Sequence, residues 1–301
     1  MLEGINSISD ASPSLLIKEG IIGYYDWGMK SIGGVLNVSE TLYPQKDPNY
    51  TNGQVWMCSK KGLIWESGIG ALVSNDETYP GVSGIHITGV YYPVSTTGIY
   101  SHKIDHVNGR VIFDSPISTS LNVSINYSHK YCDVVPVDNF SSLLRLFEQR
   151  SGRELNGSGD YHLDPRSVND LPLIGVEVPN NIGLRPYQLG GGQYLDKDVI
   201  FHCLGKTSEE ADKLVDIVTM QNDKSIYVFD LDKIYSSGAF PVGYDGVPNS
   251  GALRYPELIR DYKHSKTLRF QNTRGGGQSS PINGVIHKSV RVSAELILNI
   301  L

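Results

Sequence analysis

The sequence of 301 residues predicts an all-β sandwich-like N-terminal domain followed by an α+β domain. Residues 20–135 hold short runs in which apolar and polar side chains alternate, which is the two-residue period of half-buried strands. Residues 136–301 contain two runs with helical spacing among further strand-like runs. The 32 Gly and 18 Tyr suit a chain with many turns and strands.

The segment before the first domain, residues 1–19, is polar and contains Ser, Asp and Pro. Terminal segments of this kind are poorly ordered unless a partner or a domain holds them. We therefore expect an N-terminal arm that becomes fixed only in contact with a partner.

Strand signals in the first domain recur at intervals of about ten residues, as a sandwich requires. Residues 121–127 alternate strictly, and residues 85–92 read as a strand with a Gly break. Asn108-Gly109 favours the type I′ turn of a tight hairpin, and the strand predicted for residues 110–114 follows it. These runs predict a β-sandwich over residues 20–135.

The second domain begins with a predicted helix over residues 139–150. Asp138 can cap this helix. Four apolar residues follow at the spacing i, i+3, i+4 and i+7: Phe140, Leu143, Leu144 and Phe147. A polar stretch over residues 151–170 then predicts a loop.

Two strands are predicted on either side of a turn-rich crossing at residues 180–192. Residues 171–178 form the first strand. Residues 198–204 are continuously apolar, which is typical of a buried central strand.

A second helix is predicted over residues 207–221. Thr207-Ser208-Glu209-Glu210 fits the capping box, in which the Thr hydroxyl accepts from the third backbone amide and the Glu reaches back. The apolar stripe that follows consists of Ala211, Leu214, Val215 and Val218.

Strand-like runs close the chain at residues 225–230, 267–272 and 289–297. Residues 231–263 are predicted to be a long inserted loop, and the Gly triplet near Gly276 a flexible loop. The order of elements predicts two helices on one face of a mainly antiparallel sheet.

Composition argues against some classes of function. The net charge of −6 and the scattered Lys and Arg argue against a nucleic-acid clamp. The sequence contains no run of about 18 apolar residues, so no membrane helix is predicted. The N-terminus lacks the pattern of a signal peptide. The three cysteines are far apart in the sequence and predict reduced thiols rather than a disulfide framework or a zinc site.

No catalytic, cofactor or metal constellation is expected. His102, Asp105 and His106 could bind a metal only if three or four ligands converged. Glu209-Glu210 is explained by the helix dipole, and sequence cannot show whether Asp230 and Asp232 face each other across a cleft. The sequence therefore predicts a protein that is not an enzyme and needs no cofactor.

The aromatic residues have two principal interpretations. They form strand cores, or some of them anchor contacts with other proteins, since Tyr and Trp dominate interface hot spots. A sugar-binding platform is a third interpretation. The predicted interface segments are the N-terminal arm, the crossing at residues 179–197 and the loop at residues 275–281. The candidate interface residues are Trp27, Trp56, Tyr187, Tyr194, Gly276 and Gln278.

Short runs in the first 135 residues resemble virion structural proteins of tailed phages. They are GYYDWG at 23–28, NGQVW at 52–56, WESG at 65–68, GRVIFD at 109–114 and YSHKY at 127–131. The remainder resembles the tail-terminator family of phage necks in its order of elements. In that part, VIFHCL at 199–204 followed by EEADKL at 209–214 is similar to the family's central strand and following helix.

The resemblance implies a homo-oligomeric ring, in this family a hexamer, that sits in the virion neck or tail after assembly in the host cytoplasm. Such a ring caps the tail tube and sheath and joins them to the head connector, while DNA passes without specific binding. No membrane is involved. The first alternative is a baseplate, collar or fibre-attachment protein. The second, from another class, is a carbohydrate-binding or hydrolytic accessory protein.

Overall fold

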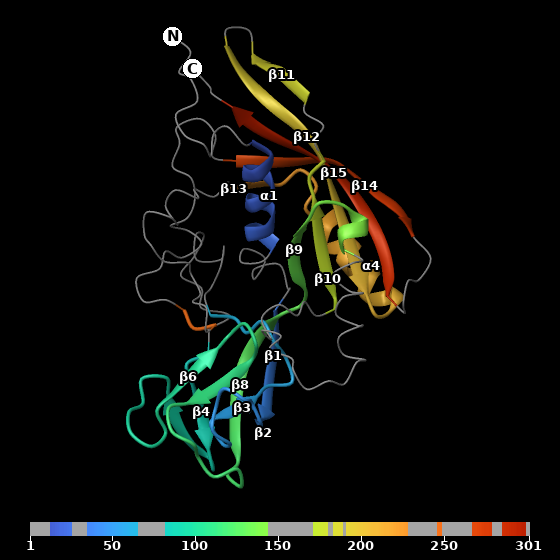
Figure 1. Ribbon diagram of the computed structural model, residues 1–301. Coiled ribbons are helices and arrows are strands. Elements are labelled where there is room, and N and C mark those ends of the chain that lie inside the picture. The colour runs from blue at the N-terminus through green and yellow to red at the C-terminus, as the bar shows by residue number, and fades with distance from the viewer. Residues whose placement is uncertain are drawn as a thin grey trace. The chain divides into compact units, whose positions relative to one another are not determined.

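A computed structural model describes residues 13–25, 35–65, 82–143, 171–179, 183–188, 191–227, 246–248, 267–278 and 285–298. The chain is rich in β-structure, with several sheets and few helices (Figure 1). Its contacts divide it into two units, which are described separately. The sandwich unit consists of Trp27–Tyr131 and Ile234–Glu257. The sheet unit consists of Met1–Asp26, Cys132–Lys233 and Leu258–Leu301.

Among its described residues, the sandwich unit contains two four-stranded sheets in which all neighbouring strands are antiparallel. One sheet has the order β1 (Val35–Thr41), β8 (Val123–Lys130), β4 (Gly84–Ile87) and β5 (Val90–Pro93). The other has the order β2 (Tyr43–Gln45), β3 (Val55–Met57), β7 (Arg110–Phe113) and β6 (His102–Asp105).

Both sheets contribute to one hydrophobic core, which is why the unit is a sandwich. Ile85 and Ile125 from one sheet and Trp56 and Phe113 from the other are buried in the same cluster. The alternation predicted for residues 121–127 is confirmed in β8, where Val123, Ile125 and Tyr127 are buried in turn.

The predicted turns of the sandwich differ from those in the structure. Residues 85–92 form not one strand but the hairpin β4–β5, because Thr88 and Gly89 both have positive φ, at 50° and 83°. A type I′ turn needs a positive φ at both of its central residues. Gly109 has φ 65°, but the φ of Asn108 is not positive, so the type I′ turn predicted there is wrong. A Cβ on Gly109 would lie 2.0 Å from the carbonyl oxygen of Lys60, so this position requires glycine.

The sheet unit contains a seven-stranded sheet among its described residues, in the order β13-β14-β15-β12-β10-β9, with β11 also paired to β12. Only β9 and β10 run parallel, so the sheet is mainly antiparallel, as predicted. The strands are β9 (Asp133–Val137), β10 (Leu173–Glu177), β11 (Gly183–Gln188), β12 (Gly191–Gly205), β13 (Ser225–Tyr227), β14 (Thr267–Gln278) and β15 (Ile286–Leu298).

Helix α4 (Ser208–Thr219) confirms the predicted capped helix. The Thr207 hydroxyl accepts a hydrogen bond from the backbone N–H of Glu210 at 3.2 Å. The Glu210 carboxylate reaches back to the N–H of Lys206 at 2.7 Å, one residue further than the capping box predicts. The side chains of Thr207 and Glu210 therefore each accept a hydrogen bond from a backbone amide at the start of the helix.

Helix α1 (Pro13–Gly23) corrects the prediction of an N-terminal arm over residues 1–19. Ile17 and Ile21 are four residues apart, lie on one side of the helix and are fully buried. The segment from Pro13 onward is thus part of the fold because it buries an apolar stripe. Residues 1–12 lie outside the described part of the chain.

Alternation along the central strands gives the sheet two faces. On the α4 face, Phe201, Val290 and Phe270 are buried, and the Tyr25 ring after α1 lies 5.4 Å from that of Phe201. Lys288, on the same face, pairs with Asp212 of α4. Helices α1 and α4 therefore cover the same face of the sheet.

The helix predicted for residues 139–150 begins at Phe140, and the part after Leu143 lies outside the described residues. Its cap is Asn139, not Asp138, because the Asn139 side-chain oxygen accepts from the N–H of Ser142 at 2.9 Å. Leu143 packs with Val137, Leu173 and Leu204 on the face opposite α4. The prediction that this helix shares a face with α4 is therefore wrong.

Two predicted loops are strands. The crossing at residues 180–192 contains β11 and the start of β12, which form a hairpin. The Gly triplet at residues 275–277 lies in β14, whose pairing with β15 shifts register between Gln271 and Arg274 and again between Gly275 and Gln278. Glycines suit such irregular positions in a strand. None of the helices in the described part of the chain is long and apolar enough to cross a membrane.

Candidate functional site

Of the two Trp residues predicted to lie at an interface, only Trp56 belongs to the described part of the chain. Trp27 lies outside the described residues. Trp56 is 1% exposed, and its indole N–H donates to the carbonyl oxygen of Gly53 at 3.0 Å. It is a core residue of β3, so its expected role as a surface anchor for protein or sugar is wrong.

The other four candidates lie on strands of the sheet unit. Tyr187 belongs to β11, and Tyr194, which is half-buried, belongs to β12 opposite Arg185. Gly276 and Gln278 lie in β14, where Gln278 pairs with Lys288 of β15. The candidates therefore occupy two hairpins rather than loops.

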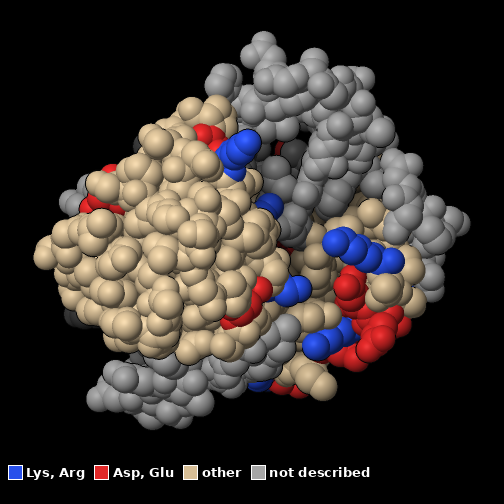
Figure 2. All heavy atoms as spheres, turned by 90° about the horizontal axis from the view of Figure 1, so that it is seen from below, with Lys and Arg blue, Asp and Glu red and all other residues tan. Residues whose placement is uncertain are grey.

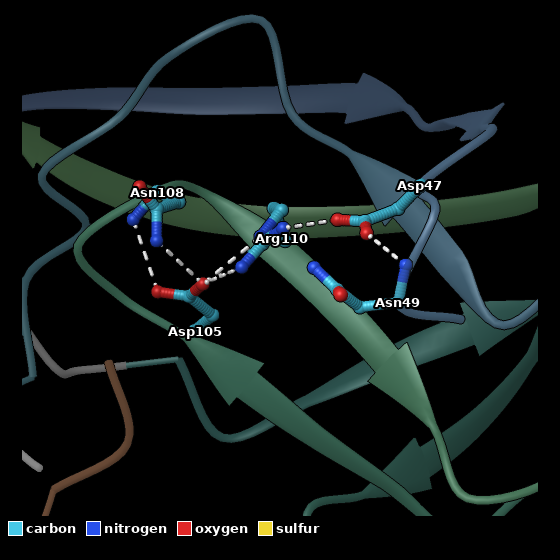
Figure 3. Close-up of polar contacts among 5 residues, drawn as sticks. All are labelled: Asp47, Asn49, Asp105, Asn108 and Arg110. Atoms are coloured by element: carbon cyan, nitrogen blue, oxygen red, sulfur yellow. Dashed lines mark hydrogen bonds and ion pairs between the residues drawn. The ribbon is translucent and has the colours of Figure 1, made fainter. Parts of the chain in front are cut away.

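A buried polar cluster surrounds Asp105, at the turn between β6 and β7 (Figure 3). Its carboxylate accepts from Asn108 N and Nδ2, at 3.0 and 2.8 Å, and from Arg110 Nε and a terminal nitrogen, at 2.9 and 2.8 Å. Arg110 also reaches Asp47 at 3.0 Å. One arginine thus bridges two carboxylates from distant segments.

Segment 246–248 also contacts this cluster. The carbonyl oxygen of Gly246 accepts from the N–H of His106 at 2.9 Å. A Cβ on Gly246 would lie 1.8 Å from the Asp105 carboxylate, and its φ is 75°. Glycine is therefore required here, and part of the predicted loop 231–263 packs on the sandwich.

The metal site considered for His102, Asp105 and His106 does not form. Donors from Asn108 and Arg110 occupy the Asp105 carboxylate, and the Nδ1 atoms of His102 and His106 lie 2.9 and 3.0 Å from the backbone oxygens of Tyr100 and Ile104. Across the described ranges, no group of three or more His, Cys, Asp or Glu is arranged for a metal. Asp230 and Asp232 lie outside those ranges.

Four exposed apolar side chains lie on the edge strand β5 and in the loop after it. Val90 is 56% exposed and Ile99 is 68% exposed, and Tyr91 and Val94 are exposed as well. We call these four residues the uncharged edge. Between Glu77 and Lys103 the sequence has no Asp, Glu, Lys or Arg. Figure 2 shows, on the face that it draws, a broad area of surface without Lys, Arg, Asp or Glu.

The backbone of β5 limits how this edge can bind a partner. Strand β5 lies at the end of the order β1-β8-β4-β5. Its last residue, Pro93, has no N–H to donate to an added strand. Side-chain packing by Val90, Tyr91 and Ile99 is therefore one mode of contact that this edge offers. Sequence reasoning missed it, although the long uncharged stretch was a visible signal.

A second cluster lies on the sheet face opposite α4. His202 Nε2 lies 2.8 Å from a carboxylate oxygen of Glu177, and His202 Nδ1 lies 3.1 Å from His287 Nε2. The Phe140 ring stacks on the His287 ring at 4.0 Å and on the His202 ring at 5.5 Å. Burial, followed by the neighbouring His202, lowers the pKa of His287 to about 4.

No family model matches this chain, and the search of curated proteins finds no similar sequence.

Proposed function

We propose that this chain is a structural subunit of a tailed-phage neck or tail. In this proposal it forms a tail-terminator-like ring that caps the tail tube and sheath and joins them to the head connector. The uncharged edge of the sandwich unit is the observation that carries the proposal. The sequence resemblance of both parts of the chain to virion proteins supplies the particular virion role.

The uncharged edge fits a contact between protein subunits. Natural edge strands are commonly protected by charged side chains, and β5 has none. Charged residues are also depleted at the centres of protein interfaces, whereas Tyr is enriched there. Val90, Tyr91 and Ile99 are exposed apolar side chains at this edge.

The proposed occupant of this edge is the next copy of the chain in the ring. An apolar surface without charges forms no ion pairs with a charged partner. When it packs on another uncharged surface, no charge is buried. A ring requires a head-to-tail contact, in which the edge of one copy packs on a different surface of its neighbour. The hairpins β11–β12 and β14–β15, which carry four of the candidate interface residues, offer further contacts within the same ring.

The test compares two Lys substitutions of exposed apolar residues. Ile99→Lys places a charge at the uncharged edge, and Met220→Lys places one at the end of α4, where Met220 is 72% exposed. Sedimentation velocity measures assembly, and negative-stain imaging with purified tail tubes measures capping. We expect wild type and Met220→Lys to form closed rings that cap tubes, and Ile99→Lys to assemble at least tenfold more weakly, about 1.4 kcal/mol.

The outcomes separate the parts of the proposal. A monomer that never caps tubes would reject the ring. Rings that form equally well with Ile99→Lys would reject the uncharged edge as the contact. Labelling at the distal end of the tail would favour the baseplate, collar or fibre-attachment role instead.

A further inference from the structure

Glu177, His202 and His287 form a hydrogen-bonded chain across three neighbouring strands, β10, β12 and β15. The His202 side chain has 6% of its surface exposed and that of Glu177 has 16%. Ionised Glu177 accepts hydrogen bonds only, so His202 Nε2 must carry a hydrogen and donate it. In neutral His202, Nδ1 is then an acceptor, and His287 Nε2 donates to it.

This chain can accept one proton without breaking. A proton on His202 Nδ1 reverses the direction of the bond between the two rings, so that His202 donates to His287 Nε2. The His287 hydrogen then resides on its other ring nitrogen. The positive His202 remains paired with the Glu177 carboxylate at 2.8 Å.

A second proton on His287 cannot be accommodated in the same geometry. Both facing nitrogens, which are 3.1 Å apart, would then carry hydrogens that point at each other. Two positive rings would also lie with their centroids 5.2 Å apart in a buried site. The Phe140 ring stacks on both imidazoles, so separating them must move Phe140.

We propose that Glu177, His202 and His287 form a proton-counting switch, which holds the helical turn at Phe140 on the sheet with one added proton and releases it with two. The inference is independent of the ring proposal, because every group in it belongs to the sheet unit. Its physical basis is the number of hydrogens that the two facing nitrogens can share.

The direction of the pH effect follows from the depressed pKa of His287. In the open state His287 regains the ordinary His pKa of 6.5, whereas in the closed state its pKa is about 4. Between these values the open state binds one more proton than the closed state. The closed state therefore loses stability as pH falls from about 6.5 to about 4, by about tenfold per pH unit.

Other charged groups on this face do not provide the same switch. Arg291 lies four residues beyond His287 on β15, and Asp198 lies four residues before His202 on β12. On β9, β10, β12 and β15, the other charged groups of the described residues that share this face are Asp133, Asp196 and Glu295, and Asp138 lies ahead of the helical turn. Lys197 and Lys288 belong to the same strands but to the α4 face. Ordinary carboxylates titrate mostly below this window, and Arg does not titrate in it.

The test measures amide hydrogen exchange of the peptide around residues 138–143 in the full-length protein from pH 4 to 7.5. Exchange is expressed relative to an unstructured peptide at the same pH, which removes the intrinsic pH dependence. Wild-type protection should fall by about tenfold per pH unit below pH 6.5. His287→Gln keeps a side-chain N–H that can donate to His202 but accepts no proton, so its protection should stay constant over the same range. His86→Gln, in the sandwich unit, should behave as wild type.

A parallel titration uses wild-type protein alone, so the test does not depend on whether a variant folds. The imidazole carbons of His287, followed by NMR, should keep the chemical shifts of the neutral ring until pH approaches 4. The proposal is overturned if both rings become protonated near pH 6.5 while the turn stays protected. It is equally overturned if His287→Gln loses protection with the same slope as wild type.

Discussion

The hydroxyl of Tyr24 donates a hydrogen bond of 2.8 Å to Oε1 of Gln221, a residue 197 positions later in the chain. Both side chains are buried, and Gln221 Nε2 in turn donates to the carbonyl oxygen of Ile217 at 2.9 Å. Burial raises the pKa of Tyr24 to about 12, so the hydroxyl keeps its proton at neutral pH. The N-terminal segment is thereby joined to the end of α4.

Tyr24→Phe should destabilise the sheet unit by about 1–3 kcal/mol, because it leaves the buried Gln221 oxygen without its donor. Urea unfolding should show a lower midpoint with an unchanged slope. Tyr43→Phe removes the same hydroxyl from a residue that is 54% exposed and should leave the midpoint unchanged. Equal effects in the two variants would show that the contact contributes nothing specific.

Gly175→Ala should also destabilise the sheet unit. A Cβ at this position would lie 3.1 Å from a methyl carbon of Leu143 and 3.3 Å from both methyl carbons of Val137. Overpacking of this kind costs about 1–3 kcal/mol, measurable by the same unfolding experiment. Gly275→Ala is the matched control, because a Cβ there meets no atom within 4 Å. If both substitutions are neutral, the helical turn does not pack on β10 as described.

Asp105→Asn should cost the sandwich unit about 3–5 kcal/mol, because it removes the charge that Arg110 faces at 2.8 Å in a buried site. Calorimetry of the full chain measures the shift in melting temperature. The comparison is Asp212→Asn, which breaks the ion pair with Lys288 at a side chain that is 57% exposed. Water screens the charges of an exposed pair, so this variant should melt close to wild type. Similar losses in both variants would contradict the importance of burial.

The three cysteines should differ in reactivity at pH 8. Burial, with a smaller effect of Glu40, raises the pKa of Cys58 to about 12, and burial also raises the pKa of Cys203 well above its ordinary value. Since the thiolate is the reactive form, both should resist iodoacetamide in the folded protein. Half-buried Cys132 should be alkylated first. Peptide mapping by mass spectrometry reads this order, and all three should react in urea. Rapid alkylation of folded Cys58 would contradict its burial.

Local signals in the sequence were sufficient for the elements that depend on neighbouring residues. Helix α4 follows from the Thr207 cap and an apolar stripe, and β8 and β15 follow from alternation over their own lengths. Each of these patterns lies within one short run of sequence. The β-rich architecture with several sheets could therefore be predicted before the structure was known.

Tertiary contacts decided the rest. Helix α1 forms in a segment whose polar start suggested an arm, because Ile17 and Ile21 find a core to bury in. The Gly triplet near Gly275 is in a strand because β15 provides a ladder for it. Propensity alone does not report such partners, since they are supplied by residues far away in the chain.

The sequence by itself determined the strand-rich composition, the capped helix α4 and the uncharged stretch that forms the edge around β5. Only the tertiary structure decided that Trp56 belongs to the core and that Glu177, His202 and His287 meet. Glu177 and His202 are 25 positions apart, and His202 and His287 are 85 positions apart. The sequence around each residue gives no sign of this contact. Their contact depends on strand register, which is set by the burial of a whole sheet face rather than by any local pattern.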